Sequence, residues 1–207
     1  MEPGRDCPLC ERLVAFRTVQ RAQHGDWHNA PVASFGGIDA ELLIVGLAPG
    51  LQGANRTGRP FTGDFAGELL YGTLIKFGFA TGTFRASPDD GLQLVRTRIT
   101  NAVRCVPPQN KPTTSEIRTC NSFLASQLKA MPELRVIVAL GRIAHDAVLT
   151  AAGEKRSRFA FGHGAEHKIG ALTFFDSYHC SRYNTNTRVL TAEMFEAVFE
   201  RVRETLG

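Results

Sequence analysis

The chain has no long apolar segment. Its 207 residues contain no run of about 18 apolar side chains, the minimum that a membrane-spanning helix needs. The N-terminal stretch also lacks the apolar centre of a secretory signal peptide. These absences predict a cytoplasmic protein that does not enter a membrane.

Internal repeats and linker-like stretches are absent as well. Hydrophobic residues make up 43% of the chain, which is ordinary for a globular protein with a sizeable core. We therefore expect a single domain that spans residues 1–207 and a protein that is a monomer.

Charge of either sign is modest, because the net charge is +4. It is unevenly spread: residues 155–188 hold six Lys or Arg against two acidic residues, and the last helical segment is rich in acids. A basic face of this kind could attract phosphates. A solvated surface of mixed charge is the alternative that the charge alone leaves open.

A glycine-rich loop follows the first apolar run of the chain. Residues 42–45 are continuously apolar, which predicts a strand buried on both faces of a sheet. Gly46 closes the run, and four further glycines and two prolines follow within residues 49–63. Glycine lets a backbone turn sharply and approach a ligand closely. Open α/β sheets bind their ligands where such a loop leaves the carboxyl end of a strand.

Strand and helix patterns alternate along the rest of the chain. Further strands are predicted at about residues 98–103, at 135–140 and from 172–175 onward. Alternation of this kind predicts a largely parallel sheet covered on both faces by helices. We interpret residues 24–40, 80–93 and 154–168 as loops. Helices are expected after Cys10, over residues 65–77, after the capping box of Thr113 and Glu116, over residues 142–152, and after Thr191.

Four of the five cysteines have a spacing that suggests a metal centre. Cys7 and Cys10 are separated by two residues, and Cys105 and Cys120 by fourteen. If the two pairs converge, four thiolates would fit zinc or an iron–sulfur cluster, and spacing alone does not choose between them. The alternative is that Cys120, on an apolar helical stripe, is simply core. Cys180 has no partner spacing.

Several side chains with useful chemistry lie at predicted strand or helix ends. Asn101 offers the donor and the acceptor that reading an imide edge requires, although it could instead satisfy loop backbone. His179 follows the fourth strand at the same sheet edge, which favours a site over a structural histidine. Asp64 precedes a helix and could be its N-cap. Phe61 belongs to no helical or strand stripe, so exposed stacking is as good an interpretation as burial. The residues after His179 that could contact a polymer backbone or its bases are Ser181, Arg182, Tyr183 and Asn184.

Four motifs together resemble a known family. GLAPG at 46–50, NRTGRPFTGD at 55–64, TNAVRC at 100–105 and HCSRYN at 179–184, with the four cysteines, resemble the family 5 (B-type) uracil-DNA glycosylases over nearly the whole chain. The resemblance implies a three-layer α/β/α sandwich around a four-stranded parallel sheet. It also implies an enzyme that hydrolyses the N-glycosidic bond of uracil in DNA, with hypoxanthine and xanthine as further candidate bases. Its DNA partner would therefore contain uracil or other deaminated bases.

The resemblance also implies roles for particular residues. Phe61 would stack on the flipped base, Asn101 would bind its Watson–Crick edge, and His179 would stabilise the departing base. The backbone of Gly46, Ala48 and Gly50 would face the base. A structural [4Fe–4S] cluster would be held by Cys7, Cys10, Cys105 and Cys120. If the base is turned out of the duplex, we expect Arg182, Tyr183 and Asn184 to fill the vacated stack. Arg156, Arg158 and Ser181 are expected to hold phosphates.

Two positions depart from the patterns of related enzymes. Leu47 stands where family 4 enzymes place a glutamate, so the first loop has no carboxylate to activate water. Asp64 becomes the candidate for that role. Cys180 stands where proline is usual after the histidine, which bears on the rigidity of that loop.

Two other functions fit parts of the same sequence. A non-catalytic nucleic-acid-binding module would need the basic segments but neither Asp64 nor His179. A protein that binds uracil covalently would need an inserted basic loop containing a histidine, for which residues 156–167 are the place to look.

Overall fold

A five-stranded sheet forms the centre of the computed structural model, which describes residues 2–207. Four strands pair in parallel in the order β4 (Thr97–Asn101), β1 (Leu42–Gly46), β5 (Val136–Leu140) and β7 (Leu172–Ser177). The four-stranded parallel sheet expected from the sequence is therefore confirmed.

A fifth strand corrects one part of the sequence interpretation. β6 (Glu166–Ile169) pairs antiparallel with β7 at the edge of the sheet, inside the segment that we interpreted as a loop. Three of its four residues are polar and not buried, as suits a strand with one free edge. Its sequence therefore carries little of the apolar signal that marked the other strands.

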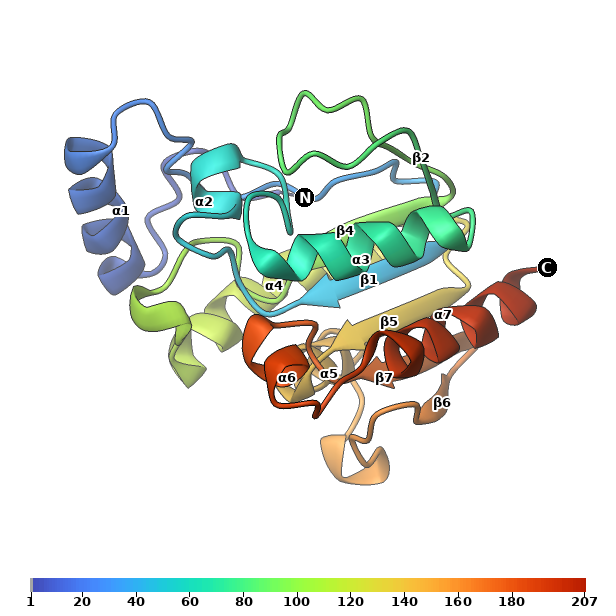
Figure 1. Ribbon diagram of the computed structural model, residues 1–207. Helices are drawn as coiled ribbons and strands as arrows, with labels where there is room; N and C mark the ends of the chain where they lie inside the picture. The colour runs from blue at the N-terminus through green and yellow to red at the C-terminus, as the bar shows by residue number, and fades with distance from the viewer. Residues whose placement is uncertain (1) are drawn as a thin grey trace.

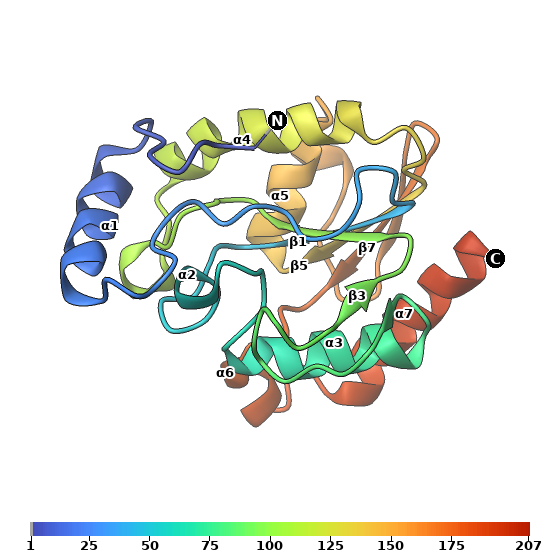
Figure 2. The same cartoon turned by 90° about the horizontal axis from the view of Figure 1, so that it is seen from above.

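Helices cover both faces of the sheet, as Figures 1 and 2 show. α3 (Phe65–Lys76) and α7 (Ala192–Leu206) lie on one face, while α4 (Thr114–Ala130) and α5 (Arg142–Ala151) lie on the other. α1 (Glu11–Gln23) lies beyond the edge at which the parallel strands end. The three-layer α/β/α arrangement is confirmed, and within residues 2–207 no helix is both long and apolar enough to cross a bilayer.

Short elements occupy segments that the sequence patterns left irregular. β2 (Ala80–Thr81) and β3 (Gln93–Leu94) form a small antiparallel pair. α2 (Ala54–Thr57) lies within the glycine-rich loop, and α6 (Arg182–Asn186) follows His179. Two 3-10 turns, η1 (Pro108–Asn110) and η2 (Arg156–Arg158), complete the set.

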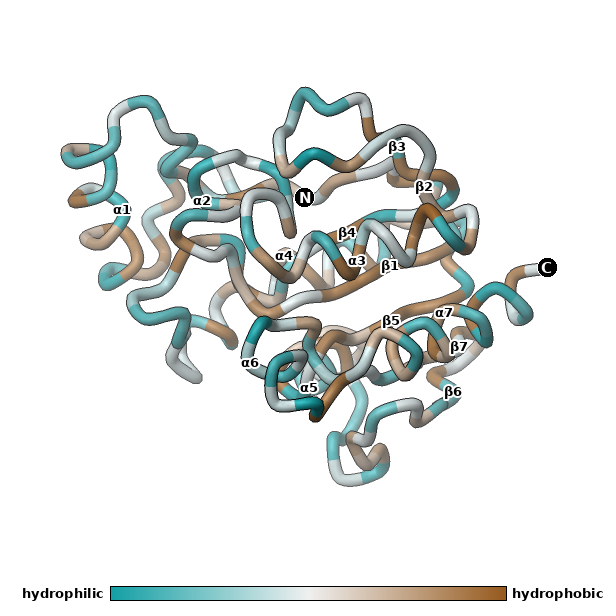
Figure 3. Tube along the Cα trace, viewed as in Figure 1, coloured by the Kyte–Doolittle hydropathy of each residue, from teal (hydrophilic) through white to brown (hydrophobic). Residues whose placement is uncertain are grey.

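The continuous apolar run of β1 is explained by burial on both sides. Leu42 and Ile44 pack in the cluster beneath α3 and α7, whereas Leu43 and Val45 pack in the cluster beneath α4 and α5. All five residues of the strand are buried, and Figure 3 shows the same hydrophobic character along β1 and β5. A strand with two buried faces needs apolar residues at every position rather than at every second one.

The predicted capping box begins α4 and also connects α1 to the body of the protein. The Thr113 hydroxyl accepts from the Glu116 amide at 3.2 Å, and the Thr113 amide donates to the Glu116 carboxylate at 2.7 Å. Arg12 of α1 donates to the same carboxylate at 2.8 and 2.7 Å. This guanidinium is the main cause that lowers the pKa of Glu116.

A buried ion pair fixes the loop that precedes α3. Arg59 donates to both carboxylate oxygens of Asp90 at 2.8 and 2.7 Å, and to the Thr62 hydroxyl at 2.7 Å. Its guanidinium also lies over the rings of Phe35, Tyr71 and Phe84. Hydrogen bonds from Arg59 hold the pKa of Asp90 well below its usual range. The Arg59 side chain therefore fixes the turn from Arg59 to Thr62.

Replacing Asp90 with alanine should destabilise the protein strongly. The change leaves the buried Arg59 guanidinium without its counter-ion, and breaking a buried pair in this way typically costs about 3–5 kcal/mol. Urea unfolding monitored by circular dichroism measures the loss. The control is Asp89→Ala at the neighbouring exposed position, which should stay within about 0.5 kcal/mol of the parent. Equal effects of the two changes would contradict the structural role of the pair.

Candidate active site

A cleft of about 1000 Å³ opens where the parallel strands end. Its walls come from the glycine-rich loop after β1, the start of α3, the turn between β5 and α5, and the segment after β7. This is the edge at which open α/β sheets bind ligands. Of the residues predicted for a site, those that line it are Ala48, Gly50, Asp64, His179, Ser181, Arg182 and Tyr183.

Three predicted residues do not line the cleft but lie against one another, and one of them contacts His179. Gly46 and Asn101 are paired across β1 and β4, and Asn101 is buried. A Cβ atom at position 46 would lie 2.6 Å from the Phe61 ring and closer still to the Asn101 Oδ1 atom. The Phe61 ring stacks against the His179 ring with centroids 6.0 Å apart. Only glycine leaves room for these side chains at this point of β1.

Phe61 is not exposed, so that interpretation is wrong. It is 6% exposed and packs in the cluster beneath α3 and α7. Its backbone has a φ of +53°, a value that is rare for residues other than glycine. Two hydrogen bonds hold the backbone around Phe61. Arg59 donates to the Thr62 hydroxyl, and the Tyr71 hydroxyl donates to the Pro60 carbonyl at 2.6 Å.

His179 is a neutral imidazole at the wall of the cleft. Its ring lies beside Phe61, and its Cβ atom would lie 3.5 Å from a Cβ at Gly141. Burial lowers the pKa of His179 to about 4, because the charged form would lose hydration. At neutral pH one ring nitrogen therefore carries a proton that it can donate, and the other can accept a hydrogen bond.

Asp64 occupies the N-cap position of α3 but its side chain makes no capping hydrogen bond. The Oδ1 atom is buried and has no partner among the described residues. The Oδ2 atom lies against the glycine-rich loop, 3.1 Å from where a Cβ at Gly50 would be. Burial raises the pKa of Asp64 above that of an ordinary aspartate. The backbone amides of Gly67 and Ala66 in the first turn of α3 partly offset this rise, so the carboxylate faces both the helix end and the cleft.

The rim of the cleft carries aromatic and basic side chains. Tyr183 is 73% exposed, and the Arg182 guanidinium lies over the Phe65 ring at 5.3 Å. Arg142, the first residue of α5, also lines the cleft, and the sequence analysis missed it. Its position directly after Gly141, at the end of the third predicted strand, was the signal that could have found it.

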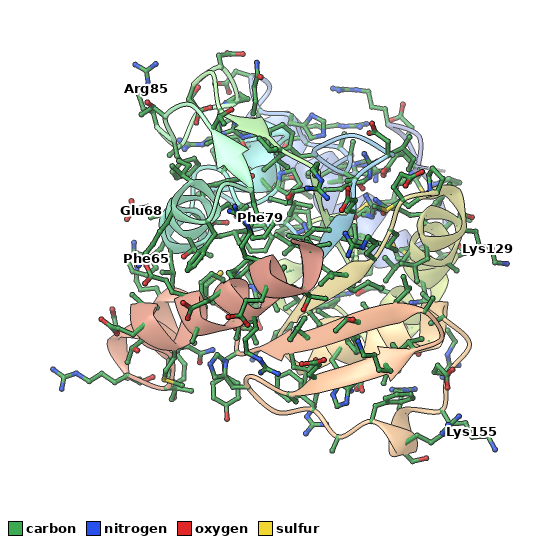
Figure 4. All side chains as sticks on the ribbon, turned by 90° about the vertical axis from the view of Figure 1, so that its right-hand side faces the viewer. Phe65, Glu68, Phe79, Arg85, Lys129 and Lys155 are labelled. Carbon is green, nitrogen blue, oxygen red and sulfur yellow. The ribbon has the colours of Figure 1, made fainter. Side chains whose placement is uncertain are left out.

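Arg156 and Arg158 do not line the cleft. Arg156 pairs with Asp146 at 3.6 Å, and Arg158 pairs with Glu154 at 3.4 Å. Figure 4 shows the adjacent Lys155 on the opposite side of the molecule from Phe65 and Glu68, which do line the cleft. The structure therefore does not bring the basic 3-10 turn η2 to the site.

Four cysteines line a second pocket, between the N-terminal segment and the start of α4. These are Cys7, Cys10, Cys105 and Cys120, whereas Cys180 is buried in the core beneath α7. Arg17 donates to the Cys105 sulfur at 3.6 Å, and the Arg104 amide lies 3.3 Å from the Cys120 sulfur. Burial raises the pKa of the Cys105 thiol to about 12 and that of Cys120 to about 11. A bound metal would be needed to keep these buried thiols ionised.

The cysteine sulfurs are spread more widely than a single zinc ion requires. In a tetrahedral zinc site with bonds of about 2.3 Å, the sulfurs would lie about 3.8 Å apart. Within residues 2–207, no three of the cysteine sulfurs lie within 4.8 Å of one another. The trio that does meet this limit is His145, His167 and Asp176, and its carboxylate is already hydrogen-bonded to both imidazoles, at 2.7 and 3.2 Å.

Known proteins resemble this chain along nearly all of its length. The family model of the uracil DNA glycosylase superfamily matches residues 33–203. A type-5 uracil-DNA glycosylase from Thermus thermophilus is 45% identical over 97% of this chain and 94% of its own. Another from Pyrobaculum aerophilum is 37% identical over 98% of this chain and 90% of its own. A type-4 uracil-DNA glycosylase from Sulfurisphaera tokodaii is 32% identical over 94% of this chain and 79% of its own.

The fold, the position of the cleft and the match to the family model all indicate the same class of protein. A parallel sheet with its cleft at the strand ends is common to many enzymes, but the family match singles out one superfamily among them. The chain belongs to the uracil-DNA glycosylase superfamily and, within it, to the type-5 proteins. The family 5 resemblance of the four motifs is thereby confirmed.

The lowered pKa of His179 should make the folded protein less stable in mild acid. Unfolded chains bind a proton to this histidine below about pH 6.5, whereas the folded protein binds it only near the folded pKa of about 4. Stability is therefore lost as pH falls from about 6.5 towards 4, by about 1–2 kcal/mol at pH 5. Urea unfolding of the parent and of His179→Gln at pH 7.5 and 5 measures this contribution. The variant should lose less stability than the parent, and equal losses would contradict a neutral buried imidazole.

Proposed function

We propose that this protein hydrolyses the N-glycosidic bond of uracil in DNA and leaves an abasic site. The observation that carries the proposal is that Phe61 and Asn101 both lie against Gly46, and that Phe61 lies beside His179, which lines a cleft at the carboxyl edge of the sheet. An aromatic ring, an amide and a neutral imidazole together can stack on a base, read its edge and stabilise its anion. The type-5 uracil-DNA glycosylases that share 37–45% of the sequence support the same reaction.

Base extrusion would be the first step. A base inside a duplex is inaccessible, and turning it out costs roughly a few kcal/mol, least for a mispaired base. The exposed Tyr183 and the adjacent Arg182 are suited to fill the vacated stack, and Ser181 is suited to contact a phosphate. Phe61 would stack on the extruded base, and the Asn101 amide would pair with its Watson–Crick edge.

Bond cleavage would depend mainly on stabilising the leaving base. Breaking the bond to C1′ creates an oxocarbenium-like sugar and an anionic base. A neutral His179 ring can donate a hydrogen bond to that anion without needing a proton from solvent. Backbone amides of the Gly46, Ala48 and Gly50 segment would add further donors. The electron-poor sugar then needs only a positioned water.

Asp64 would position that water. Asp64 lines the cleft, and its Oδ2 atom lies against the glycine-rich loop. Leu47 contributes no carboxylate there, so Asp64 is the acid that the site offers. The raised pKa of Asp64 makes it a somewhat better base than an exposed aspartate.

Segment 154–168 gives little support to covalent uracil binding. His163 is hydrogen-bonded to the backbone of Tyr178 and Met194, and His167 to the buried Asp176. Neither histidine lines the cleft. We therefore favour hydrolysis, with hypoxanthine and xanthine as further proposed substrates. Arg156 and Arg158 remain proposed contacts only for DNA that extends beyond the cleft.

We also propose a [4Fe–4S] cluster held by Cys7, Cys10, Cys105 and Cys120. The N–H groups of Arg17 and Arg104 directed at two of the sulfurs suit thiolates that bind a metal centre, and the spacing of the sulfurs favours a cluster over a single zinc ion. The cluster would be structural, joining the segment before α1 to the β4–α4 connection. One chain supplies every residue of both proposed sites, so we propose that the protein acts as a monomer.

Single-turnover base release from a uracil-containing duplex tests the assignment of roles. His179→Ala should slow release by about 100- to 1000-fold, since it removes one preorganised donor. Asp64→Asn should slow it by about 100-fold and leave binding of the DNA largely intact. In the parent, release should slow as pH falls through the raised pKa of Asp64, because the protonated carboxyl cannot orient water as a base. Asp64→Asn should lose this acid-side decline, and full rates in both variants would refute the proposed roles.

Iron analysis tests the proposed cofactor. Anaerobically purified protein should contain about four irons per chain and absorb broadly near roughly 400 nm. Cys120→Ala should lose iron and soluble yield together. Cys180→Ala is the matched control, because this buried cysteine lies outside the pocket, and it should keep its iron. Zinc without iron or sulfide would rule the cluster out.

A further inference from the structure

The backbone just before His179 leaves the sheet and finds an unusual partner. β7 ends at Ser177, and the Tyr178 amide that follows donates to the Nδ1 atom of His163 at 3.2 Å. The Nε2 atom of His163 faces the Met194 carbonyl, also at 3.2 Å. An amide can only donate and a carbonyl can only accept, so Nδ1 is the acceptor and Nε2 carries the proton. Burial lowers the pKa of His163, which favours this neutral form.

The backbone of His179 itself is held from the other side. The Asn184 side-chain amide donates to the His179 carbonyl at 2.8 Å. Asn184 is in turn fixed in α6, where its backbone amide donates to the Ser181 hydroxyl at 3.3 Å. Its side chain thus faces its own loop, whereas the sequence analysis had assigned it to DNA.

We infer that His163 and Asn184 are positioning residues that clamp the backbone on both sides of His179. The inference deepens the proposed function and rests on it, since it takes His179 as the group that stabilises the departing base. The His179 ring is otherwise placed by packing between Phe61 and the Gly141 turn. The two hydrogen bonds to the Tyr178 amide and the His179 carbonyl fix the orientation of this backbone, which packing of the ring alone would not fix.

The support of His163 is itself rigid. The Gly164 amide donates to the Asp176 carbonyl at 2.9 Å, and Arg201 donates to the Gly164 carbonyl at 2.7 Å. The buried Asp176 carboxylate accepts from both His145 and His167, which ties this loop to α5 and β6. Hydrogen bonds around a buried carboxylate such as that of Asp176 favour one geometry of the surrounding loop. His163 therefore connects Tyr178, the residue before His179, to the loop that is fixed against β6 and β7.

Paired substitutions at position 163 separate positioning from bulk. His163→Asn places an oxygen acceptor near the Nδ1 position, so it can still receive the Tyr178 amide. His163→Gln places the side-chain amide group nearer the Nε2 position. The Tyr178 backbone amide is then left without its acceptor. His163→Gln should slow single-turnover uracil release by on the order of 10- to 100-fold, since displacements of about 1 Å have effects of that size. His163→Asn should recover most of the rate, and neither change should alter the Kd for the DNA by more than about threefold.

Asn184→Ala is an independent arm of the experiment. It removes the bond to the His179 carbonyl from the opposite side and does not touch His163. It should lower the single-turnover rate in the same range, again with little change in Kd. Thermal unfolding and iron content verify that each variant is folded, and this arm decides the question if His163→Gln does not fold.

A double-mutant cycle identifies the residue through which the clamp acts. In a His179→Ala background, His163→Gln and Asn184→Ala should cause no further loss, because the group that they position is gone. Equal slowing with and without His179 would show a merely structural effect and overturn the inference. The inference would also be overturned if His163→Gln and Asn184→Ala each kept the full rate while His179→Ala was slow. Absence of base release by the parent protein would instead overturn the proposed function, and this inference with it.

Discussion

The parallel direction of four strands is the constraint on which the site depends. Parallel strands end at the same edge of a sheet, so β1, β4, β5 and β7 deliver Gly46, Asn101, Gly141 and His179 to one place although they are far apart in sequence. Burial of β1 on both faces fixes the register of this edge, because a slip of one residue would exchange the two packed faces. The cleft and the residues beside it follow from that register.

Much of this arrangement could be predicted from the sequence, for identifiable reasons. β1 and β5 are short apolar runs that end at Gly46 and just before Gly141, and α4 begins at a capping box whose two hydrogen bonds are present. The rule that ligands bind at the carboxyl ends of parallel strands then points to Asn101 and His179. These predictions rest on local patterns and on one topological rule, so long-range packing does not disturb them.

The failures concern features set by contacts between distant segments. β6 is a mainly polar edge strand that exists because β7 offers it a partner. Phe61 is buried next to a turn in which Arg59 pairs with Asp90 some thirty residues away, a contact that no local pattern records. Arg156 has a charge suited to phosphate, but its place in the fold is away from the cleft.

A crystal structure of the Asp64→Asn variant bound to a duplex with a single uracil would test the account most directly. The account predicts an extruded uracil that stacks on Phe61, pairs with the Asn101 amide and places its O2 atom near the His179 ring. Tyr183 or Arg182 should then lie in the gap left in the duplex. A uracil that stays stacked, with the duplex bound instead over Arg156 and Arg158 and the cleft empty, would contradict it.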